Sequence, residues 1–219
     1  MARERKNQAN LSDADWAAFV AAVKAIKAPG AATPTYEEIA SAHLMGRHQG
    51  TAHSFPIFLP WHREFLHIFE NRLRQEDDTV TIPYWDWTTN RTMPTPLSNA
   101  GEWGVARNLA PNDRLPVSLG SAVSLAMQQT AFGSFHMQIV PPHDTVHVVV
   151  GGEMGNIQVS PRDVLFWLHH CFLDKLWHDW QTDHPGSDPD VPAHLLPTDL
   201  FEHNGNEVMS IADLDYTYA

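Results

Sequence analysis

The sequence has one cysteine, Cys171, among its 219 residues. A single cysteine excludes an internal disulfide framework and any zinc site built from several cysteines. Basic residues are also few, since 14 Lys and Arg stand against 26 Asp and Glu, and the net charge is −12. Nothing basic is clustered along the chain to follow a phosphate backbone, so we expect no nucleic-acid partner.

Long apolar runs are missing as well. No stretch is long enough to cross a bilayer, so we expect no membrane partner. The first ten residues, MARERKNQAN, are charged and lack an apolar core, which predicts no signal peptide in this chain. The expected location is therefore the cytoplasm, or export together with a partner, and the sequence does not decide between the two.

Histidine and large aromatic side chains are plentiful instead, with 14 His, 8 Trp and 10 Phe. The length predicts a single domain over 1–219 with a sizeable core. We expect residues 1–10 to form a flexible tail. Residues 183–219 are rich in Pro, Asp and Asn without a convincing period, which predicts an irregular C-terminal segment.

Apolar spacing and capping residues predict a mainly helical fold with about four core helices and long loops. Ser12 with Asp15 resembles a capping box at the start of a helix, and we expect Gly46 to end the second helix. Residues 90–120, rich in Pro, Gly and Asn, are expected to be irregular. Helices are predicted from Ser12 to Pro29, Thr35 to Gly46, Pro60 to Gln75, Ser121 to Gln129 and Ser160 to Gln181.

The stretch SPRDVLFWLHHCFLDKLWHDWQ is the most informative of these helices. Its first residue, Ser160, suits an N-cap, and Pro161 suits the first helical position. Apolar residues cover much of its surface, which predicts a buried helix. The sequence nevertheless places His169 and His170 there, with Asp174 one turn further on, and buried polar groups need partners.

Other histidines have spacings that suit metal ligands. His143 and His147 share one face if PPHDTVHVVVGG is a helix, although VHVVV also has strand propensity and this element stays open. His53 and His62 would lie about 13 Å apart on one helix. They can meet at one ion only if His53 lies in the loop before the third helix. His43 lies near the end of the preceding helix, beside that loop.

These spacings suggest two groups of three imidazoles, one of His43, His53 and His62 and one of His143, His147 and His170. Sites built from nitrogen ligands suit copper, zinc, nickel or iron. Zinc held by three histidines is therefore an open alternative. Two such groups on the helices of one bundle favour a pair of metal ions instead.

Five stretches then reveal a family resemblance: YEEIASAH, HSFPIFLPWHREFLHIFE, IPYWDW, HDTVHVVVGGEM and SPRDVLFWLHHCFLDKLWHDWQ. Together they resemble tyrosinases, catechol oxidases and molluscan haemocyanins, the type 3 binuclear copper proteins, in the short form found in bacteria. The resemblance extends from about Tyr36 to Gln181. It implies a mainly α fold, with the four-helix-bundle core of the tyrosinase type, long loops and little β structure.

The resemblance implies two copper ions, copper A bound by His43, His53 and His62 and copper B by His143, His147 and His170. His48 is the open alternative to His43. His169 is implied to be a core residue or a support behind the ligands, and Asp174 to fix the ring orientation of His170. His67 lies off the face of His62. The other histidines are expected at the surface or in the core: His136, His178, His184, His194 and His203.

Two features depart from the family pattern. Many relatives join a cysteine to a copper A histidine by a thioether, but Cys171 lies in the copper B region. Efficient tyrosinases place Asn after the first copper B histidine and Glu about two turns before it, whereas here Asp144 follows and 134–142 contain no Glu. Asp144 is then either the acceptor of a phenol proton or a partner of a copper-bound imidazole. The small Val148 is expected to leave room for substrate above copper B.

The resemblance implies a copper oxidoreductase with O2 as co-substrate and a small phenolic substrate. It would oxidise ortho-diphenols (catechols) or ortho-aminophenols to quinone-type products, with weaker ortho-hydroxylation of monophenols. A haemocyanin-like O2-binding protein without turnover and a three-histidine zinc hydrolase are the alternatives. About 38 residues follow Gln181, too few for the lid domain of many relatives, so we expect an open site. The preferred substrate, a copper-delivery helper protein and the oligomeric state are left open.

Overall fold

The computed structural model describes residues 3–48, 50, 52–191 and 200–219, apart from the side chains of residues 47 and 48. Two short strands, β1 (Arg3–Arg5) and β2 (Tyr216–Tyr218), accompany the helices. None of the described helices has the length and apolar character needed to span a membrane. The α-helices within these ranges are α1 (Asp13–Lys27), α2 (Tyr36–His48), α3 (Phe58–Glu76), α4 (Ser118–Met127), α5 (Phe132–Val150) and α6 (Leu165–Asp183). The prediction of a mainly α fold with little β structure is therefore confirmed.

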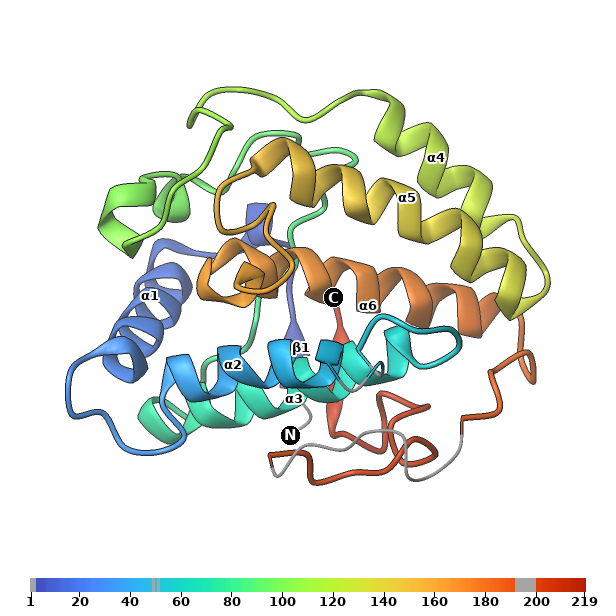
Figure 1. Ribbon diagram of the computed structural model, residues 1–219, viewed down its shortest axis with the longest axis horizontal. Coiled ribbons are helices and arrows are strands. Elements are labelled where there is room, and N and C mark those ends of the chain that lie inside the picture. The colour runs from blue at the N-terminus through green and yellow to red at the C-terminus, as the bar shows by residue number, and fades with distance from the viewer. Residues whose placement is uncertain (1–2, 49, 51, 192–199) are drawn as a thin grey trace.

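Four helices form the core, with α5 and α6 running side by side above α2 and α3 in Figure 1. The long helix α3 packs on α6, while α4 covers α5 and α1 covers α3. Aromatic contacts join these layers, since the rings of Phe69 and Trp167 stack 3.8 Å apart. The buried Tyr36 hydroxyl accepts from Trp167 Nε1 and donates to the Pro161 carbonyl, which ties α2 to the start of α6.

The first two helices show where local signals suffice and where they mislead. Ser12 and Asp15 form the predicted capping box at the start of α1. Helix α2 does not end at Gly46, as we expected, but continues to His48. Gly46 is there for packing, because a Cβ at this position would lie 2.7 Å from Cζ2 of Trp61 on α3. The absent side chain therefore lets α2 approach α3 closely.

The helices that carry His143, His147 and His170 also differ in part from expectation. The ambiguous PPHDTVHVVV stretch is helical, with both prolines inside α5. Helix α6 begins at Leu165 instead of near Ser160, because Ser160–Arg162 forms a separate 3-10 turn. The N-cap role predicted for Ser160 is therefore wrong. The carboxylate of Asp163 instead accepts the backbone N–H of Leu165, at 2.9 Å.

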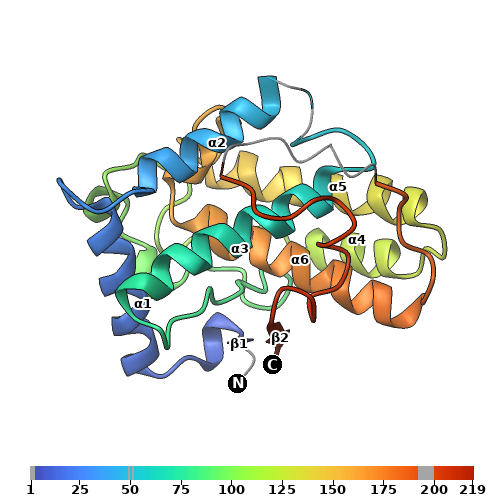
Figure 2. The same cartoon turned by 90° about the horizontal axis from the view of Figure 1, so that it is seen from below.

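The expectation of a flexible tail over 1–10 is wrong for residues 3–10. Strand β1 pairs in parallel with β2, so that Arg3 faces Tyr216 and Arg5 faces Tyr218. Figure 2 shows the two strands side by side, next to the C-terminus of the chain. The fully buried Arg5 guanidinium bonds both carboxylate oxygens of Glu70 on α3. The partners of this segment lie far away in sequence, so no local pattern indicated its order.

Candidate metal centre

Three imidazoles from α2, the following loop and α3 converge, and we call them group A (His43, His53 and His62). One nitrogen of each lies within 4.8 Å of the others. His53 lies in the loop before α3, as its distance in sequence from His62 required. Nδ1 of His62 lies 2.8 Å from the Phe58 carbonyl, which can only accept a hydrogen bond. The ring proton is therefore on Nδ1, and Nε2 keeps a free lone pair.

Three more imidazoles form group B (His143 and His147 on α5 and His170 on α6). Their Nε2 atoms are 3.0 Å apart for His143 and His147, 3.3 Å for His143 and His170, and 3.2 Å for His147 and His170. Ligand nitrogens at about 2.0 Å from one ion lie roughly 3.3 Å apart when arranged tetrahedrally. The spacing of group B therefore fits a single metal ion.

Proton positions in group B support the same conclusion. Nδ1 of His143 donates to the Asp144 carboxylate at 2.9 Å, and Nδ1 of His147 donates to the Met154 carbonyl at 2.9 Å. In the neutral rings both Nε2 atoms are then unprotonated, and their lone pairs face each other across 3.0 Å. Two acceptors so close repel each other unless a cation lies between them. The donor set thus fits a metal ion that prefers imidazole ligands.

Burial keeps three of the six rings in the form that binds metal. Desolvation is the largest influence on His62, His147 and His170, and it lowers the pKa of each well below the usual value. Neighbouring imidazoles lower these pKa values further, because two adjacent rings cannot easily both be charged. Neutral imidazole is the form that offers a lone pair to a metal.

Both groups open into one cavity of about 290 Å³. Val148, 69% exposed, and Ile157, 40% exposed, are apolar residues at its opening. Among the described residues, none from the C-terminal segment 183–219 lines this cavity. Its lining consists of His43, His53, His143, Asp144, His147, Val148, Met154, Gly155, Ile157 and Ser160.

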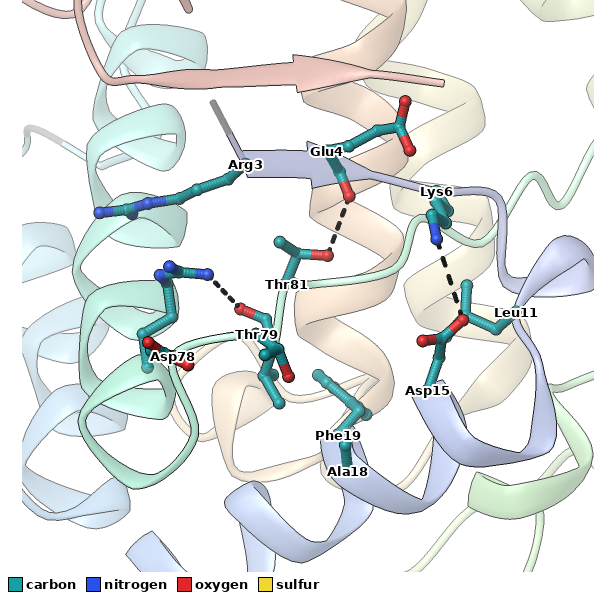
Figure 3. Close-up of a pocket in the computed structure, with 12 residues that line it drawn as sticks. Arg3, Glu4, Lys6, Leu11, Asp15, Ala18, Phe19, Asp78, Thr79 and Thr81 are labelled. Carbon is teal, nitrogen blue, oxygen red and sulfur yellow. Dashed lines mark hydrogen bonds and ion pairs between the residues drawn. The ribbon is translucent and has the colours of Figure 1, made fainter. Parts of the chain in front are cut away.

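A second cavity, of about 340 Å³, lies between β1, α1 and the loop after α3. Figure 3 shows Lys6 directed toward Asp15, and Thr81 bonded to the backbone oxygen of Glu4. No histidine lines it among the described residues. Lys6 and Asp15 form an ion pair in this lining, and the cavity is separate from groups A and B.

The chain matches the model of the common central domain of tyrosinase over residues 33–118 and 105–183. The tyrosinase of Streptomyces glaucescens is 34% identical over 84% of this chain and 84% of its own. The tyrosinase of Streptomyces antibioticus is 32% identical over 97% of this chain and 96% of its own. The chain belongs to the tyrosinase family. The family resemblance found in the sequence is thereby confirmed.

The fold agrees with this assignment. A functional unit of octopus haemocyanin superposes with a TM-score of 0.82 over 99% of this chain and 68% of that one, at 24% identity. The chain is a copper oxidoreductase of the tyrosinase type, and both histidine groups are of a kind that can hold copper. Copper fits the donor set, because the three Nε2 atoms of group B face one point and the Nδ1 protons of His143 and His147 leave two of these atoms with a lone pair for a metal.

The role predicted for Asp174 in this tyrosinase-family site is wrong. Its carboxylate does not contact His170 but bonds Arg63 Nε at 2.5 Å and the Tyr216 and Tyr218 hydroxyls at 2.6 Å each. Burial alone would raise the pKa of Asp174, yet the charges of Arg63 and Arg5 bring it below its usual value. Both oxygens are occupied by these partners, so Asp174 joins α6 to α3 and to the chain ends.

The ring of His170 is held by stacking on neighbouring rings and not by a carboxylate. Its ring lies parallel to that of His62, with centroids 4.3 Å apart and planes 10° apart. Phe166 packs on it at 4.1 Å, and its Nδ1 has no hydrogen-bond partner among the described residues. Groups A and B are therefore joined by direct ring contact between one histidine of each.

The adjacent His169 is fully buried beside group B. Its ring stacks on His143 with centroids 4.9 Å apart and planes 17° apart. One of its nitrogens lies within 4.8 Å of the group B nitrogens, yet it makes no contact of hydrogen-bond length with them among the described residues. This placement agrees with a core residue that supports the ligands from behind.

The structure places Asp144 and Val148 at the cavity, where the sequence predicted functions for them. Asp144 lines the cavity, its side chain is 64% exposed, and one oxygen accepts from His143. It is therefore placed for either of its two predicted roles. His43 lies in group A, whereas the side chain of its alternative, His48, lies outside the described residues.

The remaining histidines whose side chains the structure describes belong to neither group. His67 bonds Asn71, and His203 bonds Glu64. His136 is buried among Phe55, Phe58 and Phe132. His184 bonds the Trp180 carbonyl, His178 packs beside Tyr218, and His194 lies outside the described residues.

Two residues that contact His147, Met154 and Ser160, were not predicted from the sequence to do so. The Met154 carbonyl accepts from His147, and the Ser160 hydroxyl lies 3.1 Å from the same ring nitrogen. The Gly-Gly-x-Met loop was a signal for Met154, but nothing in the sequence indicated Ser160. Cys171 is buried, and its thiol points to the Ile82 carbonyl. It belongs to neither histidine group.

Proposed function

We propose that this chain binds two copper ions and uses O2 to oxidise ortho-diphenols or ortho-aminophenols to quinone-type products. Group A would hold one ion, and group B the other. Copper bound there would supply the redox chemistry that couples oxidation of the substrate to reduction of O2. The observation that carries the proposal is the pair of histidine groups that open into one cavity, with facing unprotonated nitrogens in group B.

The cavity supports a small aromatic substrate. Its volume of about 290 Å³ suits a molecule with a single ring, and its opening carries the apolar side chains of Val148 and Ile157. A phenolic ring would pack against Val148 while its hydroxyls point inward, between the imidazoles of the two groups. Val148 would then set how closely a ring and its substituents approach group B.

Asp144 supports the proton transfers of this reaction. A diphenol loses its hydroxyl protons on oxidation, and a nearby carboxylate can accept them. One oxygen of Asp144 accepts from Nδ1 of His143, and its exposed side chain borders the cavity. A monophenol, with a pKa near 10, is less acidic than an ortho-diphenol and is therefore harder to deprotonate, and we propose weaker ortho-hydroxylation of monophenols.

The open cavity favours an enzyme over a protein that only binds O2 reversibly, because a substrate can enter it. No described residue of 183–191 or 200–219 lines the cavity, so these segments do not block substrate there. The test is to load the purified chain with copper, count copper per chain, and follow O2 uptake and quinone formation with a catechol. We expect two copper ions and steady turnover. Copper and O2 binding without turnover would indicate a carrier, and one zinc ion per chain would contradict the proposal.

A further inference from the structure

The hydroxyl of Ser160 lies behind His147 at the edge of group B. Ser160 Oγ is 3.1 Å from Nδ1 of His147 and 3.0 Å from the Met154 carbonyl. The Met154 sulfur lies 3.6 Å from the same oxygen. Ser160 is 1% exposed and contributes to the cavity lining. This side chain therefore joins α5, the 151–159 loop and the turn before α6 at a single atom.

Only one placement of the protons satisfies the contacts among His147, Met154 and Ser160. The Met154 carbonyl can only accept, so it takes the Nδ1 proton of His147 at 2.9 Å and the hydroxyl proton of Ser160 at 3.0 Å. The lone pairs of Ser160 Oγ then face the same Nδ1–H, which is shared between two acceptors. His147 is thereby held as the tautomer whose Nε2 points toward His143 and His170.

The other two group B rings are held differently. His143 bonds the carboxylate of Asp144, which is 64% exposed, and Nδ1 of His170 has no partner among the described residues. Of these three rings, only His147 has its Nδ1 fixed by a buried neutral pair of acceptors. A rotation of the His147 ring would move its Nε2 away from the point that the Nε2 atoms of His143 and His170 also face.

The position of Ser160 is itself fixed by the backbone. Its carbonyl accepts the N–H of Asp163 at 3.1 Å within the 3-10 turn. The carbonyl of the next residue, Pro161, accepts the buried Tyr36 hydroxyl at 2.8 Å. Because Ser160 lies in this 3-10 turn, it does not cap α6. The same turn places the Ser160 hydroxyl beside the ring of His147.

We propose that Ser160 is a positioning residue for His147, and that it strengthens metal binding at group B by fixing the direction of Nε2. The inference rests on the proposed copper site. Loss of a group that supports a metal-bound histidine typically lowers metal affinity 10–100-fold. Since Ser160→Ala leaves the Met154 carbonyl in place, we expect a loss of about tenfold, at the lower end of that range.

The test isolates group B with a His53→Ala background, in which group A lacks one ligand. Cobalt(II) is titrated into the full-length chain, and its visible absorption gives both the affinity and the coordination geometry. Ser160→Ala should weaken cobalt binding about tenfold and change the absorption spectrum, whereas Ser160→Thr, which keeps the hydroxyl, should restore both. Thr145→Ala is the matched control, because this hydroxyl lies on α5 between His143 and His147 but bonds the Pro141 carbonyl.

A second readout uses the metal-free protein. The imidazole ¹H–¹⁵N spectrum should show a protected Nδ1–H for His147, and Ser160→Ala should shift that resonance without affecting His62. Unchanged cobalt affinity in Ser160→Ala would overturn the proposal, whether or not the resonance shifts, and so would a loss confined to thermal stability. If the unmodified chain binds no metal, the proposed function fails, while the Nδ1–H resonance still tests the hydrogen bond.

Discussion

Replacing Asp174 by Asn tests whether this buried carboxylate stabilises the fold or orients a metal ligand. Arg5 and Arg63 are fully buried, and the carboxylates close to them are Asp174 and Glu70. Asparagine would leave one buried positive charge without compensation. Breaking a buried ion pair from one side typically costs about 3–5 kcal/mol. That is a large share of the roughly 5–15 kcal/mol that stabilises a typical domain.

For a chain of this size, each kcal/mol corresponds to about 2–4 °C in Tm, so Asp174→Asn should lower Tm by roughly 6–20 °C. The assay is thermal unfolding of the metal-free protein, followed by circular dichroism. Asp179→Asn is the matched control on the same helix, because its pair with Lys175 is partly exposed and worth at most about 0.5 kcal/mol. Below the unfolding temperature, Asp174→Asn should still bind metal at group B.

The pH dependence of this effect follows from the lowered pKa of Asp174. A carboxyl whose pKa is lower in the folded state stabilises the fold above its unfolded pKa, about 3.9, and this stabilisation is lost as the pH falls toward the folded pKa. The Tm difference between the unmodified chain and Asp174→Asn should thus be constant from pH 7 to 5 and shrink below about pH 4. An unchanged Tm combined with loss of metal from group B would refute this reasoning.

Three further predictions concern other sites. Gly46→Ala should destabilise the protein by about 1–3 kcal/mol, measured by chemical denaturation, because the added methyl would lie 2.7 Å from the Trp61 ring; an unchanged midpoint would contradict the packing role. The Cys171 thiol should resist alkylation at pH 8 until the protein unfolds, because burial raises its pKa to about 12; rapid labelling of the folded protein would contradict this. Asp144→Asn should lower kcat/KM for monophenols more than for matched diphenols if Asp144 accepts the phenol proton, whereas equal losses with reduced copper content would assign it to support of His143.

The features that could be predicted from the sequence depend on local spacing or on strongly constrained chemistry. The capping box of α1 lies within a few residues of chain, and so does the face that His143 and His147 share in a helix, although the sequence left helix or strand open for that stretch. The need for His53 to lie outside α3 followed from helix geometry, because two ligands of one ion must come close together. Neither the capping box nor the position of His53 depends on a partner distant in sequence, so both could be predicted without knowledge of tertiary contacts.

The failures all involve partners distant in sequence. Gly46 resembles a helix terminator, but its function depends on Trp61. Arg5 lies in a charged N-terminal stretch that resembles a flexible tail, yet Glu70 and β2 order it. Asp174 lies one turn from His170, but its carboxylate forms hydrogen bonds with Arg63 and two tyrosines. Ser160 has the sequence context of an N-cap, but its hydroxyl lies beside the ring of His147 instead.

The measurement that tests the central claim most directly is copper content per chain, determined together with catechol oxidation. The unmodified chain should bind two copper ions and oxidise the catechol with uptake of O2. His53→Ala, in group A, and His143→Ala, in group B, should each lose one copper ion and the activity. His178→Ala, on α6 outside both groups, should lose neither. A single metal ion in the unmodified chain, or two copper ions with full activity in His143→Ala, would contradict the account.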